Sequence, residues 1–187
     1  MEASITEIFC RMTGKHDSHN TLAVVPVRAG SKGISQKNIM LVDGLPLYLH
    51  AVLQGLRTVG RVLLSTDIKE IIEKDLPSGC ILCKRPAHLA SDNASMDSVI
   101  HHLIEEQSLH GCTIILLQAT SPLRLDGDIT AALNLFESHP YDMVLSVVER
   151  DRGALKYGTL QGNAFNLLHE QRYCFFNRQQ LPPVHGP

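Results

Sequence analysis

Short apolar runs recur along the chain and are separated by amphipathic stretches. Residues 22–27 read Leu-Ala-Val-Val-Pro-Val, an almost wholly apolar run that is typical of a strand buried on both faces of a parallel sheet. Similar runs lie at residues 61–66, 80–84, 113–117 and 143–148. The pattern therefore predicts five strands.

Helical spacing of apolar residues fills the intervals between these strands. It predicts helices at residues 46–58, 68–75 and 95–109, and a further helix that opens near Asp128. Alternation of strand and helix predicts an α/β fold with a doubly wound, mostly parallel sheet and right-handed crossovers. In such sheets ligands bind at the carboxyl ends of the strands, so we expect functional residues in the loops after the first, third and fourth strands.

The two ends of the chain lie outside this alternation. Residues 1–20 are polar without a sustained period, which predicts a flexible N-terminal extension with at most a short helical turn at residues 5–12. Residues 21–150 form the expected α/β core. Residues 151–187 follow it as a smaller segment.

Composition and charge narrow the class of protein. The chain has 187 residues, of which 44% are hydrophobic and 19% charged, as in globular domains that bury a core. A formal net charge of -2 argues against a protein that coats nucleic acid, so an anionic ligand must be met by a local cluster of cations. The sequence has five cysteines without small-scaffold spacing, no signal peptide and no run of membrane-spanning length. We therefore expect a cytoplasmic protein without nucleic-acid or membrane partners.

The loop after the first strand concentrates cations and glycines. It reads Arg-Ala-Gly-Ser-Lys-Gly-Ile-Ser-Gln-Lys-Asn over residues 28–38. Gly30 and Gly33 would allow positive φ and close backbone approach, and the cations would offset the charge of a polyphosphate. The loop matches neither the Walker A pattern nor the dinucleotide fingerprint. An ordinary basic surface loop remains the alternative.

Five motifs then follow one another in a definite order. They are residues 28–38, Ser65-Thr-Asp67, Arg85-Pro-Ala-His-Leu-Ala90, Leu116-Leu-Gln-Ala-Thr-Ser-Pro-Leu-Arg124 and Arg178-Gln-Gln-Leu-Pro182. Together they resemble the motif series of the acylneuraminate cytidylyltransferases, which make CMP-sialic acid and CMP-legionaminic acid. The resemblance runs from about residue 21 to about residue 183. It implies a Rossmann-like nucleotide-diphospho-sugar transferase fold and transfer of CMP from CTP to a nine-carbon 2-keto sugar acid, with release of pyrophosphate.

The resemblance also implies nucleotide-binding residues. The phosphate loop contributes Arg28, Gly30, Ser31, Lys32 and Lys37, of which Arg28 and Lys32 are the catalytic candidates. Asn38 and Arg85 would hold the cytosine base, and Ser95 would adjoin it. The residue types alone leave other roles open: a turn cap for Asn38, a surface ion pair for Arg85 and a helix N-cap for Ser95.

Sugar contacts are implied in two places along the chain. The candidates are Gln118, Thr120, Ser121, Lys156 and Arg178. A loop-bracing hydrogen bond is the alternative for Gln118, and a solvated surface charge is the alternative for Lys156 and Arg178. The family's usual proline after the glutamine is replaced here by Ala119, which makes the loop less rigid.

The implied reaction requires Mg²⁺. Similar enzymes bind it with an Asp-x-Asp motif well after the Arg-Gln-x-Leu-Pro element, whereas this sequence ends at Pro187. We therefore expect a C-terminally shortened chain whose metal ligands are not identifiable, and a non-catalytic nucleotide-binding homologue is the alternative function. Asp126 is expected to face solvent, and Asp128 to be a helix N-cap.

The segment near the C-terminus carries a hairpin signal. Alternation over residues 155–168 predicts a β-hairpin with Gly162-Asn163 at its turn. In relatives this region reaches across a dimer and contributes to the partner's sugar pocket. The resemblance therefore implies a homodimer.

Cys80 and Cys83 have the Cys-x-x-Cys spacing. Alternation along an apolar strand would point the two thiols to opposite faces of the sheet, and no second pair exists to complete a zinc site. We expect a buried pair without a metal.

Overall fold

The structure is a computed structural model that describes residues 7–11, 20–30 and 33–186. The chain divides into two compact units, residues 1–146 and residues 147–187.

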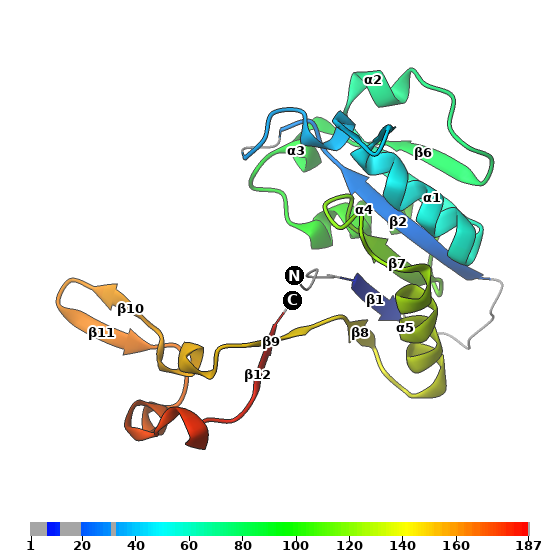
Figure 1. Ribbon diagram of the computed structural model, residues 1–187. Helices are drawn as coiled ribbons and strands as arrows, with labels where there is room; N and C mark the ends of the chain where they lie inside the picture. The colour runs from blue at the N-terminus through cyan, green and yellow to red at the C-terminus, as the bar shows by residue number, and fades with distance from the viewer. Residues whose placement is uncertain (1–6, 12–19, 31–32, 187) are drawn as a thin grey trace. The chain divides into compact units, whose positions relative to one another are not determined.

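A six-stranded sheet forms the centre of the first unit, with strand order β6-β5-β2-β7-β1-β8 (Figure 1). Four neighbouring strands are parallel: β6 (Cys80–Lys84), β5 (Val62–Thr66), β2 (Thr21–Val27) and β7 (Thr113–Leu117). Strands β2, β5 and β7 are almost entirely buried, as their apolar runs predicted. The expected mostly parallel α/β sheet is confirmed.

Strand β1 (Glu7–Arg11) corrects the expectation for the N-terminal segment. The sequence pattern predicted at most a short helical turn there, but β1 pairs antiparallel with β7 and with β8 (Met143–Leu145). A five-residue segment has little intrinsic preference, so the backbone groups available on β7 and β8 decide its conformation. Residues 1–6 and 12–19 lie outside the described part of the chain.

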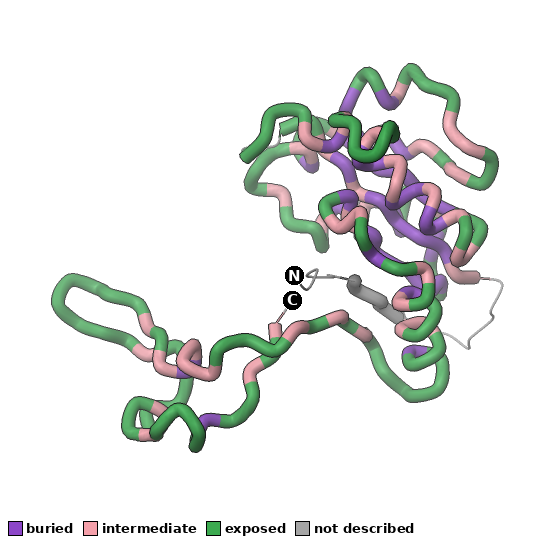
Figure 2. Tube along the Cα trace, in the orientation of Figure 1, coloured by how far each residue is buried: buried purple, intermediate pink, exposed green. Residues whose placement is uncertain are grey.

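Helices cover both faces of the sheet. On one face, helices α1 (Leu47–Val59) and α5 (Asp126–Ser138) pack on Ala23, Val25 and Val27 of β2. On the other face, helix α4 (Met96–Gln107) packs on Leu22 and Val24. Figure 2 shows the buried residues running along the strands and the helix sides that meet them. Alternate residues of β2 therefore serve two separate apolar layers.

Short elements connect these layers. They are η2 (Lys37–Ile39), β3 (Leu41–Val42), β4 (Leu45–Pro46), α2 (Lys69–Ile72) and α3 (Ala87–Ala90). Helix α2 is shorter than the predicted span of residues 68–75. Ile71 is its only buried residue, so packing supports little more than one turn.

The predicted strand at residues 143–148 is two strands. Residues Met143–Leu145 form β8 in the sheet of the first unit, whereas Val148–Arg150 form β9 in the second unit. The apolar run alone did not reveal this break, because both halves have strand character. The pairing partners differ: β8 pairs with β1, and β9 pairs with β12 (Val184–Gly186).

The second unit contains the expected hairpin. Strands β10 (Gly158–Gln161) and β11 (Ala164–Leu167) pair antiparallel, and Gly162 between them has φ 59°. Three short 3₁₀ helices complete the unit: η3 (Arg152–Lys156), η4 (Gln171–Phe175) and η5 (Arg178–Gln180). Across the described part of the chain, no helix combines the length and apolar character needed to cross a membrane.

Candidate functional site

A cavity of about 270 Å³ opens at the carboxyl ends of β2, β6 and β7. The chain proceeds from β2 outward to β5 and β6, and then returns to the other side of β2 as β7. Such a reversal of strand order creates a crevice in which open α/β sheets bind ligands. The residues that line it are Pro26, Arg28, Gly33, Lys37, Asn38, Arg85, Met96, Gln118, Ala119 and Thr120.

Arg28 follows directly on β2 and is held by the segment after α3. Its Nη1 lies 2.7 Å from Asp92 Oδ1 and 3.5 Å from the backbone oxygen of Ala90. The next residue, Ala29, donates its backbone N–H to Asp67 Oδ1 at 2.9 Å. The beginning of the loop after β2 is therefore anchored to two other loops, and Arg28 already pairs with an anionic oxygen.

The remainder of the loop carries a left-handed residue, but not at the expected position. Gly30 does not have positive φ; Gln36 does, with φ 52°. The sequence pattern missed this because a glutamine seldom adopts that conformation, and the short helix η2 that begins at Lys37 imposes it here. Ser31 and Lys32 lie outside the described residues.

Asn38 is buried at the base of the loop, with 7% of its surface exposed. Its Nδ2 donates to the backbone oxygen of Arg28 at 2.9 Å. Among the described residues its Oδ1 has no hydrogen-bond partner. Asn38 thus braces the loop with one end of its amide and lines the cavity, which leaves an acceptor for a ligand.

Arg85 is a buried cation rather than a member of a surface ion pair. Its exposed fraction is 6%; Nε donates to Ser65 Oγ at 3.2 Å and Nη2 to the Ser65 backbone oxygen at 3.1 Å. Burial lowers the pKa of Arg85; the Asp67 carboxylate opposes that shift and the Arg28 cation adds to it. Within the described part of the chain, Nη1 has no hydrogen-bond partner, so the guanidinium presents a fixed donor beside the cavity.

Ser95 is the N-cap of α4. Its Oγ accepts the backbone N–H of Ser98 at 3.1 Å, and it is not among the residues that line the cavity. The neighbouring Met96 lines the cavity instead. A methionine beside an N-cap gives no chemical signal in a sequence, so sequence reasoning could not single it out.

The loop after β7 supplies Gln118 and Thr120 to the cavity wall. The Gln118 side chain has no hydrogen-bond partner in the described part of the chain, whereas its backbone oxygen accepts from Ser121 N at 3.3 Å and Arg124 Nη2 at 3.2 Å. The hydrogen bonds that hold this loop therefore reach the backbone oxygen of Gln118 and leave its side chain to the cavity. Ser121 forms the turn and does not line the cavity.

Lys156 and Arg178 belong to the second unit, and each has a partner there. Lys156 Nζ donates to the backbone oxygen of Phe176 at 2.6 Å, and Arg178 Nη2 lies 2.9 Å from Asp151 Oδ2. The Arg178 side chain is 70% exposed, as a solvated surface cation would be.

The two aspartates at the start of α5 require corrections. Asp126 does not simply face solvent: it accepts hydrogen bonds from Arg57 Nε at 2.8 Å and from Gln54 Nε2 at 3.1 Å. The Arg57 hydrogen bond is the main cause that lowers the pKa of Asp126. Asp128 is not the N-cap, because the helix begins at Asp126; its Oδ2 instead accepts from the backbone N–H of Leu125 at 3.1 Å.

Metal ligands do not gather in the described residues. No group of three or more histidine, cysteine, aspartate or glutamate side chains there could hold a metal ion. Cys80 packs with the layer under α1 and Cys83 with the layer under α4, so the expected opposite orientation is confirmed. Burial raises the pKa of each thiol to about 11, and both thiols are free.

Known proteins match the chain over most of its length. The family model described as cytidylyltransferase matches residues 22–185. The N-acylneuraminate cytidylyltransferase of Streptococcus agalactiae serotype V is 28% identical over 172 residues, which cover 89% of this chain and 41% of that protein. The CMP-N,N'-diacetyllegionaminic acid synthase of Legionella pneumophila is 32% identical over 123 residues, which cover 61% of this chain and 52% of that protein.

A solved structure of similar fold is CMP:2-keto-3-deoxy-manno-octonic acid synthetase complexed with CTP. It aligns with a TM-score of 0.51 and 17% sequence identity, over 79% of this chain and 64% of that chain. The Streptococcus agalactiae relative is much longer than the matched region, so this chain spans only 41% of its length. The match over residues 22–185 shows that the chain belongs to the cytidylyltransferase family.

Proposed function

We propose that the protein transfers CMP from CTP to a nonulosonic, sialic acid-type sugar acid and releases pyrophosphate, with CTP bound in the cavity beside β2. The observation that carries this proposal is the convergence of Arg28, Arg85 and Gln118 on one cavity from three separate loops. Membership of the cytidylyltransferase family supports it. The names of the Streptococcus and Legionella relatives favour a sialic acid-type substrate.

The phosphate end of CTP would lie against the loop after β2. Arg28 and Lys37 line the cavity, and the sequence adds Gly30, Ser31 and Lys32 to the same loop. At an effective dielectric near 20, a unit charge about 4 Å from a phosphate oxygen contributes roughly 4 kcal/mol before desolvation. Several such charges would stabilise the negative charge that builds up on phosphoryl oxygens during transfer.

The cytosine base would lie between Asn38 and Arg85. Arg85 Nη1 can donate to the O2 or N3 acceptor of the base, and Asn38 Oδ1 can accept from the exocyclic amine. Uracil offers a carbonyl where cytosine has that amine. The pair would therefore favour CTP over UTP.

The sugar would lie against Gln118 and Thr120, with Ser121 in the same loop. The anomeric hydroxyl would attack the α-phosphorus and form a new O–P bond. The bond from the α-phosphorus to the α,β-bridging oxygen would break, pyrophosphate would leave, and the hydroxyl proton would pass to solvent. The neutral amide of Gln118 both donates and accepts, which suits sugar hydroxyls. We propose that Lys156 and Arg178 contact the sugar carboxylate in the site of a partner subunit.

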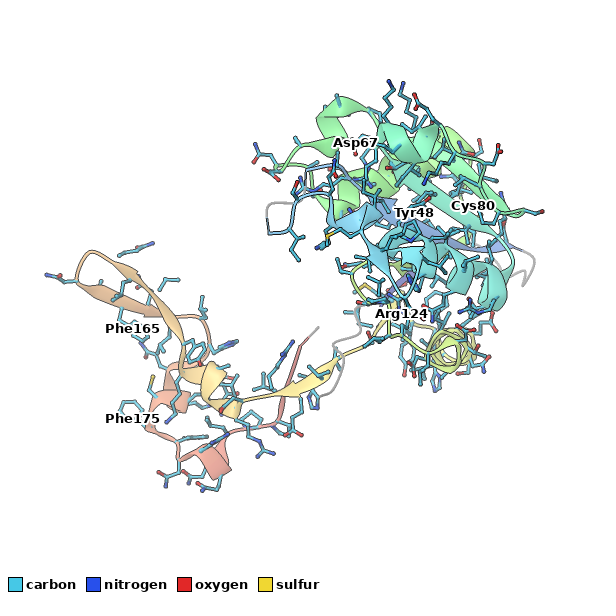
Figure 3. All side chains as sticks on the ribbon, turned by 45° about the horizontal axis from the view of Figure 1, so that its top comes forward. Tyr48, Asp67, Cys80, Arg124, Phe165 and Phe175 are labelled. Atoms are coloured by element: carbon cyan, nitrogen blue, oxygen red, sulfur yellow. The ribbon has the colours of Figure 1, made fainter. Side chains whose placement is uncertain are left out.

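Mg²⁺ and a second subunit complete the proposal. We propose that Mg²⁺ supplies Lewis-acid stabilisation of the phosphates, but we assign no residue to it, because the described residues offer no ligand cluster. The hairpin β10–β11 exposes Leu160 and Phe165, and the segment after it exposes Phe175. Figure 3 labels the two phenylalanines. We propose that this surface contributes to a homodimer, and that the protein acts in the cytoplasm.

The test separates nucleotide binding from catalysis. Titration calorimetry with CTP should show saturable binding that Arg28→Ala weakens at least about tenfold, the effect expected when a charged hydrogen-bond partner is removed. Arg61→Ala is the matched control, because Arg61 is exposed just before the amino end of β5, at the other end of the sheet. Unchanged affinity in Arg28→Ala contradicts the assignment of the loop.

Pyrophosphate release with CTP, Mg²⁺ and N-acetylneuraminate then tests the reaction. We expect release that EDTA abolishes. If the chain binds CTP but releases no pyrophosphate, the proposed reaction is wrong, and the chain is a nucleotide-binding homologue without catalytic activity.

A further inference from the structure

A buried polar contact joins helix α1 to the loop after β7. Gln54 on α1 and Arg124 at the end of the loop are each 4% exposed. Gln54 Nε2 donates to the Arg124 backbone oxygen at 2.6 Å, and Arg124 Nη1 donates to Gln54 Oε1 at 2.8 Å. The two residues thus hold each other through a pair of opposed hydrogen bonds at a buried site.

Arg124 extends this contact to the wall of the cavity. Its Nη2 donates to the backbone oxygen of Gln118 at 3.2 Å, and the same oxygen accepts from Ser121 N at 3.3 Å. The Gln118 side chain lines the cavity, whereas Arg124 does not. Arg124 therefore touches the backbone of a cavity residue without touching the space that a ligand would occupy.

An outer ion pair completes the network at the surface. Asp126 accepts from Gln54 Nε2 at 3.1 Å and from Arg57 Nε at 2.8 Å. The side chains of Arg57 and Asp126 are 58% and 43% exposed. Because exposed ion pairs contribute little, the position of the loop depends mainly on the buried Gln54–Arg124 contact.

The loop needs such a restraint. A buried arginine is costly unless its hydrogen bonds are made, so stability alone would favour an apolar residue at this position. Ala119 follows Gln118, so the backbone next to Gln118 lacks the rigidity that a proline ring would give it. A fixed donor on the Gln118 carbonyl supplies the missing constraint.

We propose that Arg124, held by Gln54, is a positioning residue that sets the place of Gln118 in the cavity and so controls contact with the sugar. This inference rests on the proposed function for the role of Gln118. The brace itself is a property of the structure and can be tested without a ligand.

The experiment uses the full chain and three variants. Arg124→Lys keeps the charge but loses the fork that reaches two acceptors. Gln54→Glu keeps the acceptor for Arg124, while it loses the donor to the Arg124 carbonyl and to Asp126. Arg57→Gln is the matched control, because it removes only the outer ion pair. Gln54→Glu also keeps the test open if Arg124→Lys does not fold.

Hydrogen exchange, ligand affinity and Tm are measured for each variant. Hydrogen exchange should be at least about tenfold faster at residues 118–121 in Arg124→Lys and Gln54→Glu, with β7 protection unchanged. The Kd of CMP-N-acetylneuraminate should rise about tenfold while the Kd of CTP stays within about twofold, because only the sugar contact is displaced.

The outcomes are distinguishable. Unchanged exchange in both buried-site variants, or an equal loss of affinity for both ligands together with a lower Tm, overturns the positioning role. If the wild-type chain binds neither ligand, the proposed function fails, and the exchange data alone decide whether Arg124 holds the loop. If residues 118–121 exchange at the same rate in Arg124→Lys and in Arg57→Gln, Arg124 does not hold the loop, and that part of the inference is wrong as well.

Discussion

At the scale of single residues, the cavity depends on buried polar groups that already have part of their hydrogen bonds. Arg85 donates hydrogen bonds from two of its nitrogens to Ser65, and Asn38 donates one from its amide nitrogen to the Arg28 backbone oxygen. Each side chain is thereby fixed, and one polar atom is left for a ligand. Preorganisation of this kind reduces the entropy lost on binding.

Arg85→Lys tests the fork of hydrogen bonds. Lysine retains the charge but cannot hold Ser65 through two nitrogens and also present a planar donor to a base. We expect the Kd of CTP to rise by about tenfold or more, since a hydrogen bond to a charged group contributes roughly 1.5–3 kcal/mol. Calorimetry measures this effect.

Ser65→Ala is the graded control for that variant, because it removes only the hydrogen bond from Nε. It should weaken CTP binding less than Arg85→Lys does. An Arg85→Lys affinity within about twofold of wild type would show that the charge alone matters.

At the scale of elements, α1 lies unusually close to the sheet. A Cβ added at Gly55 would lie 2.8 Å from Val62 Cγ2 and 2.9 Å from Ala23 Cβ. The helix can approach β2 and β5 this closely only because residue 55 has no side chain. The same helix carries Gln54, so its distance from the sheet also affects the contact with Arg124.

Gly55→Ala should therefore destabilise the fold, although alanine favours helix by about 1 kcal/mol over glycine. Overpacking of a tight contact costs about 1–3 kcal/mol, which exceeds that gain. Gly127→Ala on α5 is the matched control, because nothing lies within 4 Å of a Cβ there. Urea denaturation measures the free energy of unfolding of both variants. Equal values would mean that α1 can shift away from the sheet without loss of stability.

At the scale of the whole molecule, two units of different character are joined in one chain. The first has two apolar layers around a sheet, whereas the second buries little more than Leu155 and Leu181 among its described residues. Small units with few buried side chains gain stability from association. This contrast is the physical basis of the proposed homodimer.

Sedimentation analysis should detect a dimer that Phe165→Ser combined with Phe175→Ser shifts towards monomer. These side chains are 55% and 88% exposed in the isolated chain, so their burial in an interface would be favourable (Figure 3). Leu41→Ser is the control, an equally exposed apolar residue of the first unit at 69%. A wild-type chain that remains monomeric at all concentrations contradicts the proposal.

The sequence predicted those features that local pattern controls. Strand β7 has the predicted bounds, and the predicted hairpin turns at Gly162, which has positive φ. Apolar runs and glycine-containing turns carry their own structural preference. The resemblance of the motifs also identified Arg28, Arg85 and Gln118 as candidate binding residues, and all three line the cavity.

The sequence could not predict contacts between distant segments. The pairing of β1 with β7 and the ion pair of Arg28 with Asp92 are two such contacts. Asp67 stood in a recognised motif, but its bond to the Ala29 N–H appears only when the loops after β2 and β5 meet.

The amino-acid sequence by itself determined the four parallel strands, the three long helices and the residues available for nucleotide chemistry, because periodicity and residue type are local properties. Only the tertiary structure decided which of these residues share a cavity, which of them brace a loop, and at which residue one unit ends and the next begins. The physical reason is that a hydrogen bond such as Gln54–Arg124 depends on the distance between segments in space. Separation along the sequence does not specify that distance.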